Sequence, residues 1–192
     1  MVGSTSRKRL LVLASHPVPY WVPLYRRLSE ESWLELLVAY GDVSNVLGRL
    51  ERWGQKNFRW SGNLLDGYPF IALRNVAPRP DPTTPVGKIN PGLPRLLSAW
   101  RPDAVLVSGY SHLFHVLAFL ASWRYGVPVL YVGDSNSLMD SRRGWRRVVR
   151  RPLLRSLYAR LDLCLFVGRR NREHYERHGV PPERLVRFAL AV

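Results

Sequence analysis

Continuously apolar segments of strand length recur along this 192-residue chain, with helical patterns between them. The apolar segments occupy residues 10–15, 33–40, 104–107, 127–135 and 162–168. Their apolar residues do not alternate with polar ones, which is typical of strands that are buried on both faces. Such strands belong to parallel sheets whose strands are joined by right-handed crossovers.

The segments between these strands have helical periodicity. Leu93, Leu97 and Trp100 fall on one face of a predicted helix that Pro102 stops. The predicted helices cover 23–31, 93–100, 111–126 and 169–179, and a last short strand covers 184–190. The stretch 43–91 is rich in Gly, Pro and Trp, and we expect it to be irregular except for a short strand within 68–75.

These elements predict an α/β fold with a doubly wound, mainly parallel, Rossmann-like sheet. We find no internal repeat, low-complexity segment or break in composition, so residues 1–192 are expected to form a single domain. Apolar residues make up 46% of the chain and charged residues 22%, which is a globular composition. A chain of this length can bury a core of its own.

The net charge is +15, from 29 basic and 14 acidic residues. Eight arginines and no acidic residue lie between Arg142 and Arg160. A field of this size favours a polyanionic partner, such as a membrane surface, nucleic acid or a phosphorylated substrate. The alternative is a basic face that only meets water.

The arginine-rich segment 142–161 combines an apolar stripe with a row of cations, as helices that lie on anionic lipid do. Pro152 is expected to split it into two helices. In the alternative interpretation, the stripe packs on the sheet and only the charged face is exposed. Nucleic acid is not expected, because the chain contains no recognition-helix or ribonucleoprotein motif. The candidate membrane-binding residues are Arg143, Arg146, Arg147, Arg150 and Arg151.

The single cysteine, Cys164, lies in an apolar run and is expected to be a buried thiol. The N-terminal apolar stretch is too short for a secretory signal and lacks a small-residue cleavage site. No run of 18 apolar residues occurs. We therefore expect a cytoplasmic protein that associates peripherally with the inner face of the membrane.

Ligands of doubly wound folds bind beyond the carboxyl ends of the strands. This rule selects the loops 16–21, 109–112, 133–137 and 168–171. The first loop lacks the Gly-x-Gly-x-x-Gly turn, and Pro17 and Pro19 remove two N–H donors, so a dinucleotide site is not expected there. His16, Tyr20 and Trp21 instead offer an imidazole beside an apolar shelf, suited to a sugar ring; in the alternative, the two aromatic residues cap the core.

The second loop places Tyr110, Ser111 and His112 at a strand end. Ser111 could cap the next helix, which would put His112 in its first turn, where the helix dipole disfavours protonation. His115 shares a face with His112 and is expected to be packed in the core. Two histidines three residues apart, with no third ligand nearby, are a weak zinc signal.

The third loop contains Gly133, Asp134 and Ser135. Asp134 could accept sugar hydroxyls, pair with an arginine or cap the basic helix. Spacing alone assembles no Ser-His-Asp triad, and no Gly-x-Ser-x-Gly elbow is present.

Three stretches resemble the N-terminal half of the retaining, family-4-like glycosyltransferases of GT-B fold, a group that includes bacterial lipopolysaccharide and capsule enzymes. They are "LVLASHPVPYWVPLYRRLSE", the pair "RPDAVLVSGYSH" and "VPVLYVGDSN", and "LDLCLFVGRRNREHYERHGVPPERLVRFALAV". The order of the stretches carries the likeness, since no single motif is diagnostic. Prolines stand in the first loop where many relatives have glycine.

The resemblance implies an acceptor-binding half whose cleft wall contains His16, Tyr110, His112 and Asp134. We take His112 as the candidate catalytic residue and Tyr20, Trp21, Ser111 and Ser135 as further substrate-binding candidates. The acceptor would be a glycan or a lipid-linked molecule, and a nucleotide-sugar would be the co-substrate. The resemblance further implies that the C-terminal domain that binds this donor is absent, that this half is inactive alone, and that protein ligands hold no metal or other cofactor.

Two other function classes remain open. A non-catalytic basic module that binds anionic membrane or nucleic acid would explain the arginines. A complete small hydrolase on the same fold would need a nucleophile, for which the sequence offers no candidate.

Overall fold

The computed structural model describes residues 7–44, 46, 51–53, 56–58, 63–81, 84–133, 135 and 145–188. Of residues 51–53, 56–58 and 145–149 it describes the backbone only.

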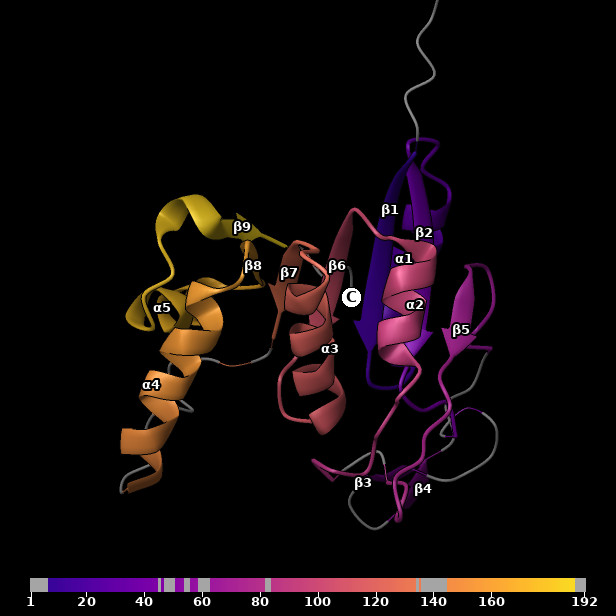
Figure 1. Ribbon diagram of the computed structural model, residues 1–192, viewed down its shortest axis with the longest axis horizontal. Coiled ribbons are helices and arrows are strands. Elements are labelled where there is room, and N and C mark those ends of the chain that lie inside the picture. Colours follow the sequence, from indigo (N-terminus) through magenta and orange to yellow (C-terminus); the bar gives the residue numbers. More distant parts are fainter. Residues whose placement is uncertain are drawn as a thin grey trace, which may run out of the picture.

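Within these residues, seven parallel strands form one sheet in the order β5-β2-β1-β6-β7-β8-β9 (Figure 1). This is the Rossmann order extended by one strand, and it confirms the predicted fold class. The strands are β1 (Lys8–Ala14), β2 (Leu34–Tyr40), β5 (Phe70–Ala72), β6 (Ala104–Ser108), β7 (Val129–Val132), β8 (Leu163–Phe166) and β9 (Leu185–Arg187).

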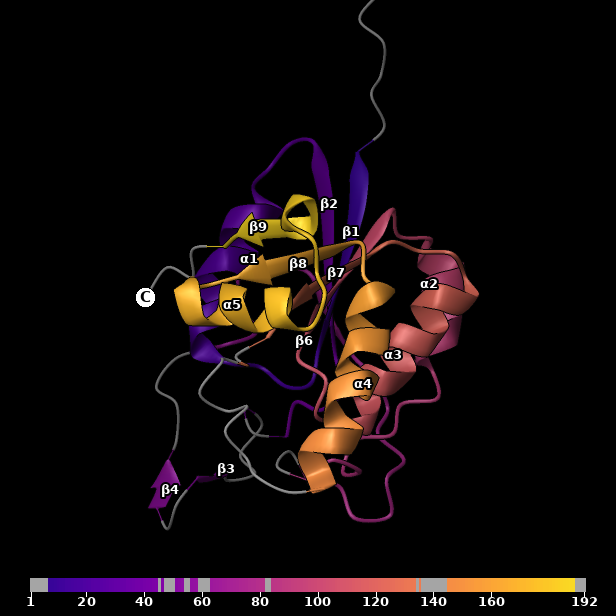
Figure 2. The ribbon, with the colours of Figure 1, turned by 90° about the vertical axis from the view of Figure 1, so that its left-hand side faces the viewer.

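Helices cover both faces of this sheet. In Figure 2, α1 lies on the opposite side of the strands from α2, α3 and α4. The helices are α1 (Val22–Ser29), α2 (Leu93–Trp100), α3 (Leu113–Arg124), α4 (Trp145–Ala159) and α5 (Arg169–Arg177), with short 3-10 turns η1 (Pro19–Trp21) and η3 (Pro182–Arg184).

Strand β1 shows why the strands are continuously apolar. Leu11 and Leu13 belong to a core shared with α2, α3, α4 and α5, whereas Val12 and Ala14 belong to a second core shared with α1. Successive side chains of a strand point to opposite faces. With a helix on each face, every buried position of the strand, from Leu11 to Ala14, is therefore apolar. Cys164 lies in the first core, so the predicted buried thiol is confirmed, and burial raises its pKa to about 12.

The described part of the stretch 43–91 contains the predicted short strand, β5, and further contacts that its composition does not predict. An antiparallel pair, β3 (Glu51–Trp53) and β4 (Lys56–Phe58), lies within it. Two side-chain amides, the half-buried Asn75 and the buried Asn90, replace regular backbone pairing further along. The Oδ1 atom of Asn75 accepts hydrogen bonds from the amides of Ala77 and Ile89, both at 3.0 Å. The Nδ2 atom of Asn90 donates to the carbonyls of Gly41, Leu73 and Arg74.

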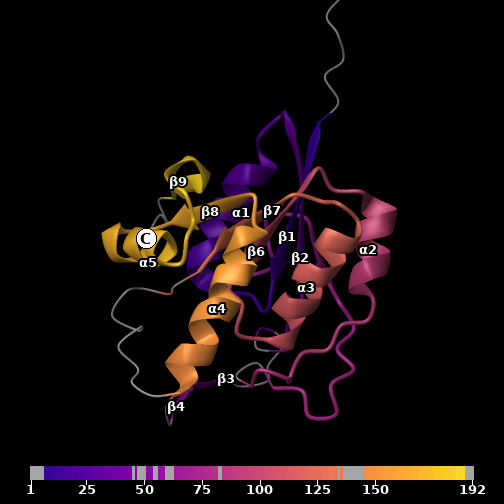
Figure 3. The same ribbon diagram turned by 60° about the vertical axis from the view of Figure 1, so that its left-hand side comes forward.

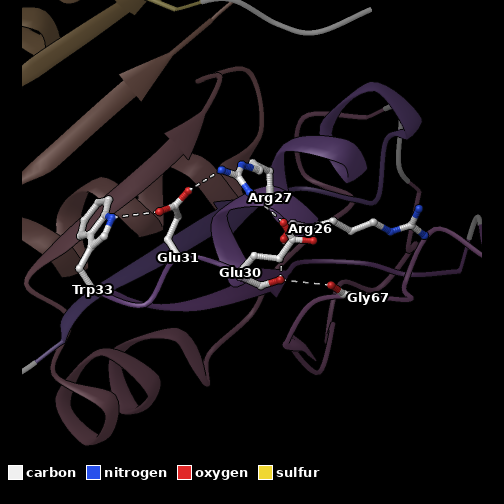
Figure 4. Close-up of polar contacts among 7 residues, drawn as sticks. Arg26, Arg27, Glu30, Glu31, Trp33 and Gly67 are labelled. Carbon is white, nitrogen blue, oxygen red and sulfur yellow. Dashed lines mark hydrogen bonds and ion pairs between the residues drawn. The ribbon is translucent and has the colours of Figure 1, made fainter.

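Polar contacts at the end of α1 hold this helix against the turn 63–67 (Figure 4). Arg27 pairs with Glu30 and Glu31, and the indole nitrogen of Trp33 donates to Glu31 at 3.2 Å. The Ser29 hydroxyl donates to the carbonyl of Gly67. These contacts fix the C-terminal end of α1. The turn η1 directly precedes the same helix in the chain.

The expected break at Pro152 is wrong, because α4 runs through this residue without interruption. Pro152 is exposed, so its ring lies on the water side of the helix. Leu154 and Tyr158 are buried on the other side. Their burial offsets the hydrogen bond that the proline nitrogen cannot donate.

Replacing Pro152 by alanine should raise the free energy of unfolding by about 2 kcal/mol. Proline inside a helix costs about 3 kcal/mol, of which about 1 kcal/mol is returned through the lower entropy of its unfolded chain. Urea denaturation followed by circular dichroism measures the change. Leu153→Ala, at the neighbouring exposed position, is the control and should change stability little. A Pro152→Ala variant no more stable than the parent would show that the helix bears no such cost.

Candidate functional site

A pocket of about 170 Å³ opens at the carboxyl ends of β1, β6 and β7. From β1 the chain continues to β2, toward one edge of the sheet, and from β6 it continues to β7, toward the other edge. The direction of the crossovers therefore reverses between β1 and β6. Ligands of open α/β sheets bind at such a switch point. The pocket is lined by residues of the strand ends, of the loops after these strands and of the first turn of α3: Ala14, Ser15, His16, Val18, Tyr20, Trp21, Ser108, Gly109, Ser111, His112, His115, Val132 and Gly133.

Two Ser-His pairs line this pocket, one after β1 and one after β6. The Oγ atom of Ser15 lies 2.9 Å from Nδ1 of His16, and the Oγ atom of Ser111 lies 3.3 Å from Nδ1 of His112. In each pair the hydroxyl can fix the tautomer and the ring orientation of the histidine that follows it. His112 is the N-cap residue of α3 but makes no side-chain cap bond, so the prediction that Ser111 caps this helix is wrong.

The two aromatic residues of the first loop have different environments. Trp21 is buried, stacked on Tyr25 and Phe188 at centroid distances of 5.9 and 5.6 Å. Tyr20 is 43% exposed and tilts against Trp21. Trp21 therefore caps the core, as the alternative had it, and both rings also line the pocket. The structure thus has a rigid apolar wall on this side.

His115 forms part of the pocket lining from the first turn of α3. It is buried, as predicted, and its ring packs edge-on against His112 at 5.4 Å. Gly109 turns the chain above this ring with a φ of +96°, a conformation that residues with a Cβ seldom adopt. A Cβ at this position would also stand 3.4 Å from Cε1 of His115.

The imidazoles of His16 and His115 are neutral at physiological pH. Burial lowers the pKa of His16 to about 4, with a further decrease from Lys88 and a smaller opposing effect of Asp42. Burial also lowers the pKa of His115 to about 3, with contributions from His112, Lys88 and His16. Lys88 itself has no solvent-exposed surface. A neutral imidazole can donate one hydrogen bond and accept another.

The third loop is held by packing and by a buried amide. A Cβ at Gly133 would lie 2.2 Å from the hydroxyl of Tyr131, which is fully buried, so this position accepts only glycine. The Nδ2 atom of Asn171, from α5, donates to the carbonyls of Ser135 at 2.6 Å and Gly133 at 3.1 Å. The fourth predicted loop thus supports the third and does not line the pocket itself.

Tyr110 and Ser135 lie beside the pocket, and neither is part of its lining. The Tyr110 hydroxyl is 3.2 Å from Oγ of Ser135 and accepts a hydrogen bond from Nη2 of Arg150. Arg150 is half-buried and reaches this loop from α4, and its predicted role at a membrane surface stays a prediction.

The pocket therefore brings together His16, Tyr20, Trp21, Ser111 and His112 of the predicted residues. Asp134 and Arg143 lie outside the described residues, as do the side chains of Arg146 and Arg147. Arg151 is exposed on α4. No three His, Cys, Asp or Glu side chains of the described part gather where they could hold a metal ion.

Three residues that shape the surroundings of the pocket were not predicted from the sequence. Lys88 lies in the stretch that composition marks as irregular, and Asn171 looks like a surface residue of a charged helix. Arg150 is one of eight similar arginines in its segment. Only its spacing from the buried Leu154 and Tyr158, four and eight residues later, places it near the inner face of α4.

The fold and the pocket together define a Rossmann-like α/β domain with a ligand site at its switch point. The Glycosyl transferase 4-like domain matches residues 42–191, and the chain belongs to this family. This confirms the resemblance to the N-terminal domain of GT-B-fold glycosyltransferases, and it supports a function of the glycosyltransferase type. No curated protein matches the chain.

Solved structures share the fold at low sequence identity. UDP-N-acetylglucosamine 2-epimerase from Rickettsia bellii is similar with a TM-score of 0.51 and 16% identity, over 94% of this chain and 44% of that one. Anabaena Alr3699/HepE in complex with UDP is similar with a TM-score of 0.57 and 11% identity, over 96% of this chain and 44% of that one. This chain thus spans less than half the length of either protein.

The two buried imidazoles should make the protein sensitive to acid. The unfolded chain binds a proton at each near pH 6.5, whereas the folded chain does so only near pH 4 at His16 and pH 3 at His115. Their contribution to stability is complete above pH 6.5 and is lost as the pH falls, by about 1.4 kcal/mol per pH unit for each histidine. Urea denaturation between pH 7 and pH 4 measures this slope.

His115→Leu should remove about half of this slope, and His16→Asn combined with it should remove most of the rest. An acid dependence that is the same in the parent and in both variants would contradict the buried neutral state.

Proposed function

We propose that this chain is the acceptor-side half of a glycosyltransferase that transfers a sugar from a nucleotide-sugar to a glycan or lipid-linked acceptor. The observation that carries the proposal is the pocket at the switch point, lined by two Ser-His pairs, in a chain of the Glycosyl transferase 4-like domain family. The residues of the pocket suit a carbohydrate. Aromatic rings pack on the apolar face of a sugar, and neutral imidazoles and hydroxyls hydrogen-bond its hydroxyl groups.

His112 is the candidate catalytic residue. It stands at the N-terminus of α3, and Ser111 lies within reach of its Nδ1 atom. An imidazole held in one orientation can position a sugar hydroxyl for reaction, and such positioning can supply a large part of a rate enhancement. His16 would hold the substrate from the opposite side, and Tyr20 and Trp21 would support its ring.

The donor is proposed to need a second half. The pocket, at about 170 Å³, is smaller than the roughly 300–1,000 Å³ of complete small-molecule sites. Each of the two similar structures is more than twice as long as the part that this chain covers, and one of them contains UDP. A nucleotide-sugar would accordingly be held between this half and another, as co-substrate.

Tyr20→Ala and His112→Ala should each weaken the binding of monosaccharides by about tenfold, because each removes a wall of the pocket. Saturation-transfer NMR with glucose, galactose and N-acetylglucosamine measures the change. Tyr125→Ala is the matched control, because Tyr125 is 45% exposed against 43% for Tyr20 and does not line the pocket.

If the parent protein and the Tyr20→Ala, His112→Ala and Tyr125→Ala variants bind monosaccharides equally, the pocket is not the saccharide site. We also expect the 192-residue chain alone to leave UDP- and GDP-sugars intact. Release of nucleotide at an enzyme-like rate would show that no second half is required.

We further propose that this domain associates peripherally with an anionic membrane. No helix of the described residues has both the length and the apolar composition needed to cross a bilayer. Exposed apolar and cationic side chains instead share the outer surface of α4. Leu153 is 66% exposed between Arg151 and Arg155, which are exposed too. In Figure 3, α3 lies next to α4. Val116 and Leu120 of α3 are exposed as well.

Replacing both Arg151 and Arg155 by glutamine should reduce the fraction of protein that co-sediments with phosphatidylglycerol vesicles, because each cation near such a surface contributes about 1 kcal/mol. Arg170→Gln with Arg177→Gln, the same loss of charge on α5, should reduce it less. Equal sedimentation with purely phosphatidylcholine vesicles would exclude an electrostatic membrane contact. Vesicle binding without any saccharide binding would favour the non-catalytic basic module.

A further inference from the structure

We propose that Arg150, Tyr110 and Ser135 form a subsite for a phosphate group beside the pocket, so that the acceptor is a phosphorylated sugar or polyol. This inference rests on the proposed function, because it names the chemistry of the molecule that the pocket would bind.

The three side chains come from three elements and converge. Arg150 extends from α4 and donates from Nη2 to the Tyr110 hydroxyl, which belongs to the loop after β6. That hydroxyl lies 3.2 Å from Oγ of Ser135, in the loop after β7. A guanidinium group and two hydroxyl groups thus meet at one point. A planar guanidinium group and neighbouring O–H donors are the groups that bind phosphate oxygens most strongly.

The subsite is built before any ligand binds. Ser135 is buried, and its carbonyl accepts the 2.6 Å hydrogen bond from Asn171. Arg150 is half-buried, which limits the screening of its charge by water. Groups fixed in this way lose little conformational entropy when a ligand arrives.

The subsite adjoins the pocket. Tyr110 stands between Gly109 and Ser111, both of which line the pocket, and Ser135 is two residues from Gly133, which also lines it. We infer that a sugar ring bound in the pocket would have its phosphate group directed toward the Arg150 guanidinium. One molecule could occupy both places.

The charges of the described residues around the pocket favour an anion. Of the described residues that line the pocket, none carries a carboxylate. The buried charge of Lys88 acts on His16 and His115, and it outweighs that of Asp42 at His16. The N-terminus of α3, a helix of 12 residues, also faces this side and favours negative charge. The charge of Lys88 and the start of α3 thus both favour a phosphorylated ligand.

The test is calorimetric titration of the 192-residue chain with four probes: inorganic phosphate, glucose 6-phosphate, glucose and UDP. We expect glucose 6-phosphate to bind at least about tenfold more tightly than glucose, since a charge-assisted contact is worth that factor or more. Arg150→Gln should remove this advantage. Arg177→Gln, the same change on an exposed arginine of α5, should preserve it.

Two further variants guard against loss of folding. Tyr110→Phe retains the ring and removes only the hydroxyl, and Arg150→Lys retains the charge and removes the planar fork. Each should weaken phosphate binding several-fold with an unchanged circular dichroism spectrum. The inference is overturned if Arg150→Gln and Arg177→Gln bind glucose 6-phosphate equally, or if glucose binds as tightly as its phosphate.

The donor is the other source of phosphate. If Arg150→Gln weakens UDP and leaves inorganic phosphate and glucose 6-phosphate unchanged, the group belongs to the nucleotide, and the acceptor assignment is overturned. Failure of this inference leaves the saccharide binding that Tyr20 and His112 support untouched. Conversely, a pocket that binds no saccharide would refute the proposed function while the Arg150 dependence of phosphate binding still stands.

Discussion

Burial of the central strands on both faces is the constraint on which the rest of the structure depends. In β1, β6 and β7, alternate side chains enter two separate cores, one under α2–α5 and one under α1. Parallel pairing then places all carboxyl ends at one edge of the sheet. The loops that follow the strands meet there whatever their own sequences are. The pocket is therefore a consequence of the core, and His16 and His112 come together although 96 residues separate them.

The same constraint explains how much of the fold could be predicted. Strands such as 33–40 and 162–168 could be predicted from their own residues, because burial on two faces favours a nearly continuous apolar run. The continuity of α4 through Pro152 could not be predicted in the same way. Local chemistry at Pro152 favours a break, and only the packing of Leu154 and Tyr158 on the sheet overrides it. The backbone arrangement of the described residues within 73–92 likewise depends on contacts of Asn75 and Asn90, one of them with a residue 49 positions away.

Some residues of the candidate site could be predicted from the sequence and others could not. Residues that directly follow a strand, such as His16 and Ser111, could be selected from the rule on strand ends. Lys88 and Arg150 reach the site from an irregular loop and from the middle of a helix, and no local pattern distinguishes them. His115 was expected in the core, and it is both a core residue and part of the pocket lining. What the pattern could not show was the electrostatic environment, which arises from buried charges that are distant in sequence.

The close fit of Gly133 against Tyr131 has a consequence for how this architecture can diversify. A side chain at position 133 would have to displace a ring at the centre of the larger core, so that edge of the pocket is inherited together with the fold. Tyr20 lines another part of the rim, where much of its ring is in solvent. New ligand preferences in descendants of this domain would arise at that rim, while the glycine rim stayed constant.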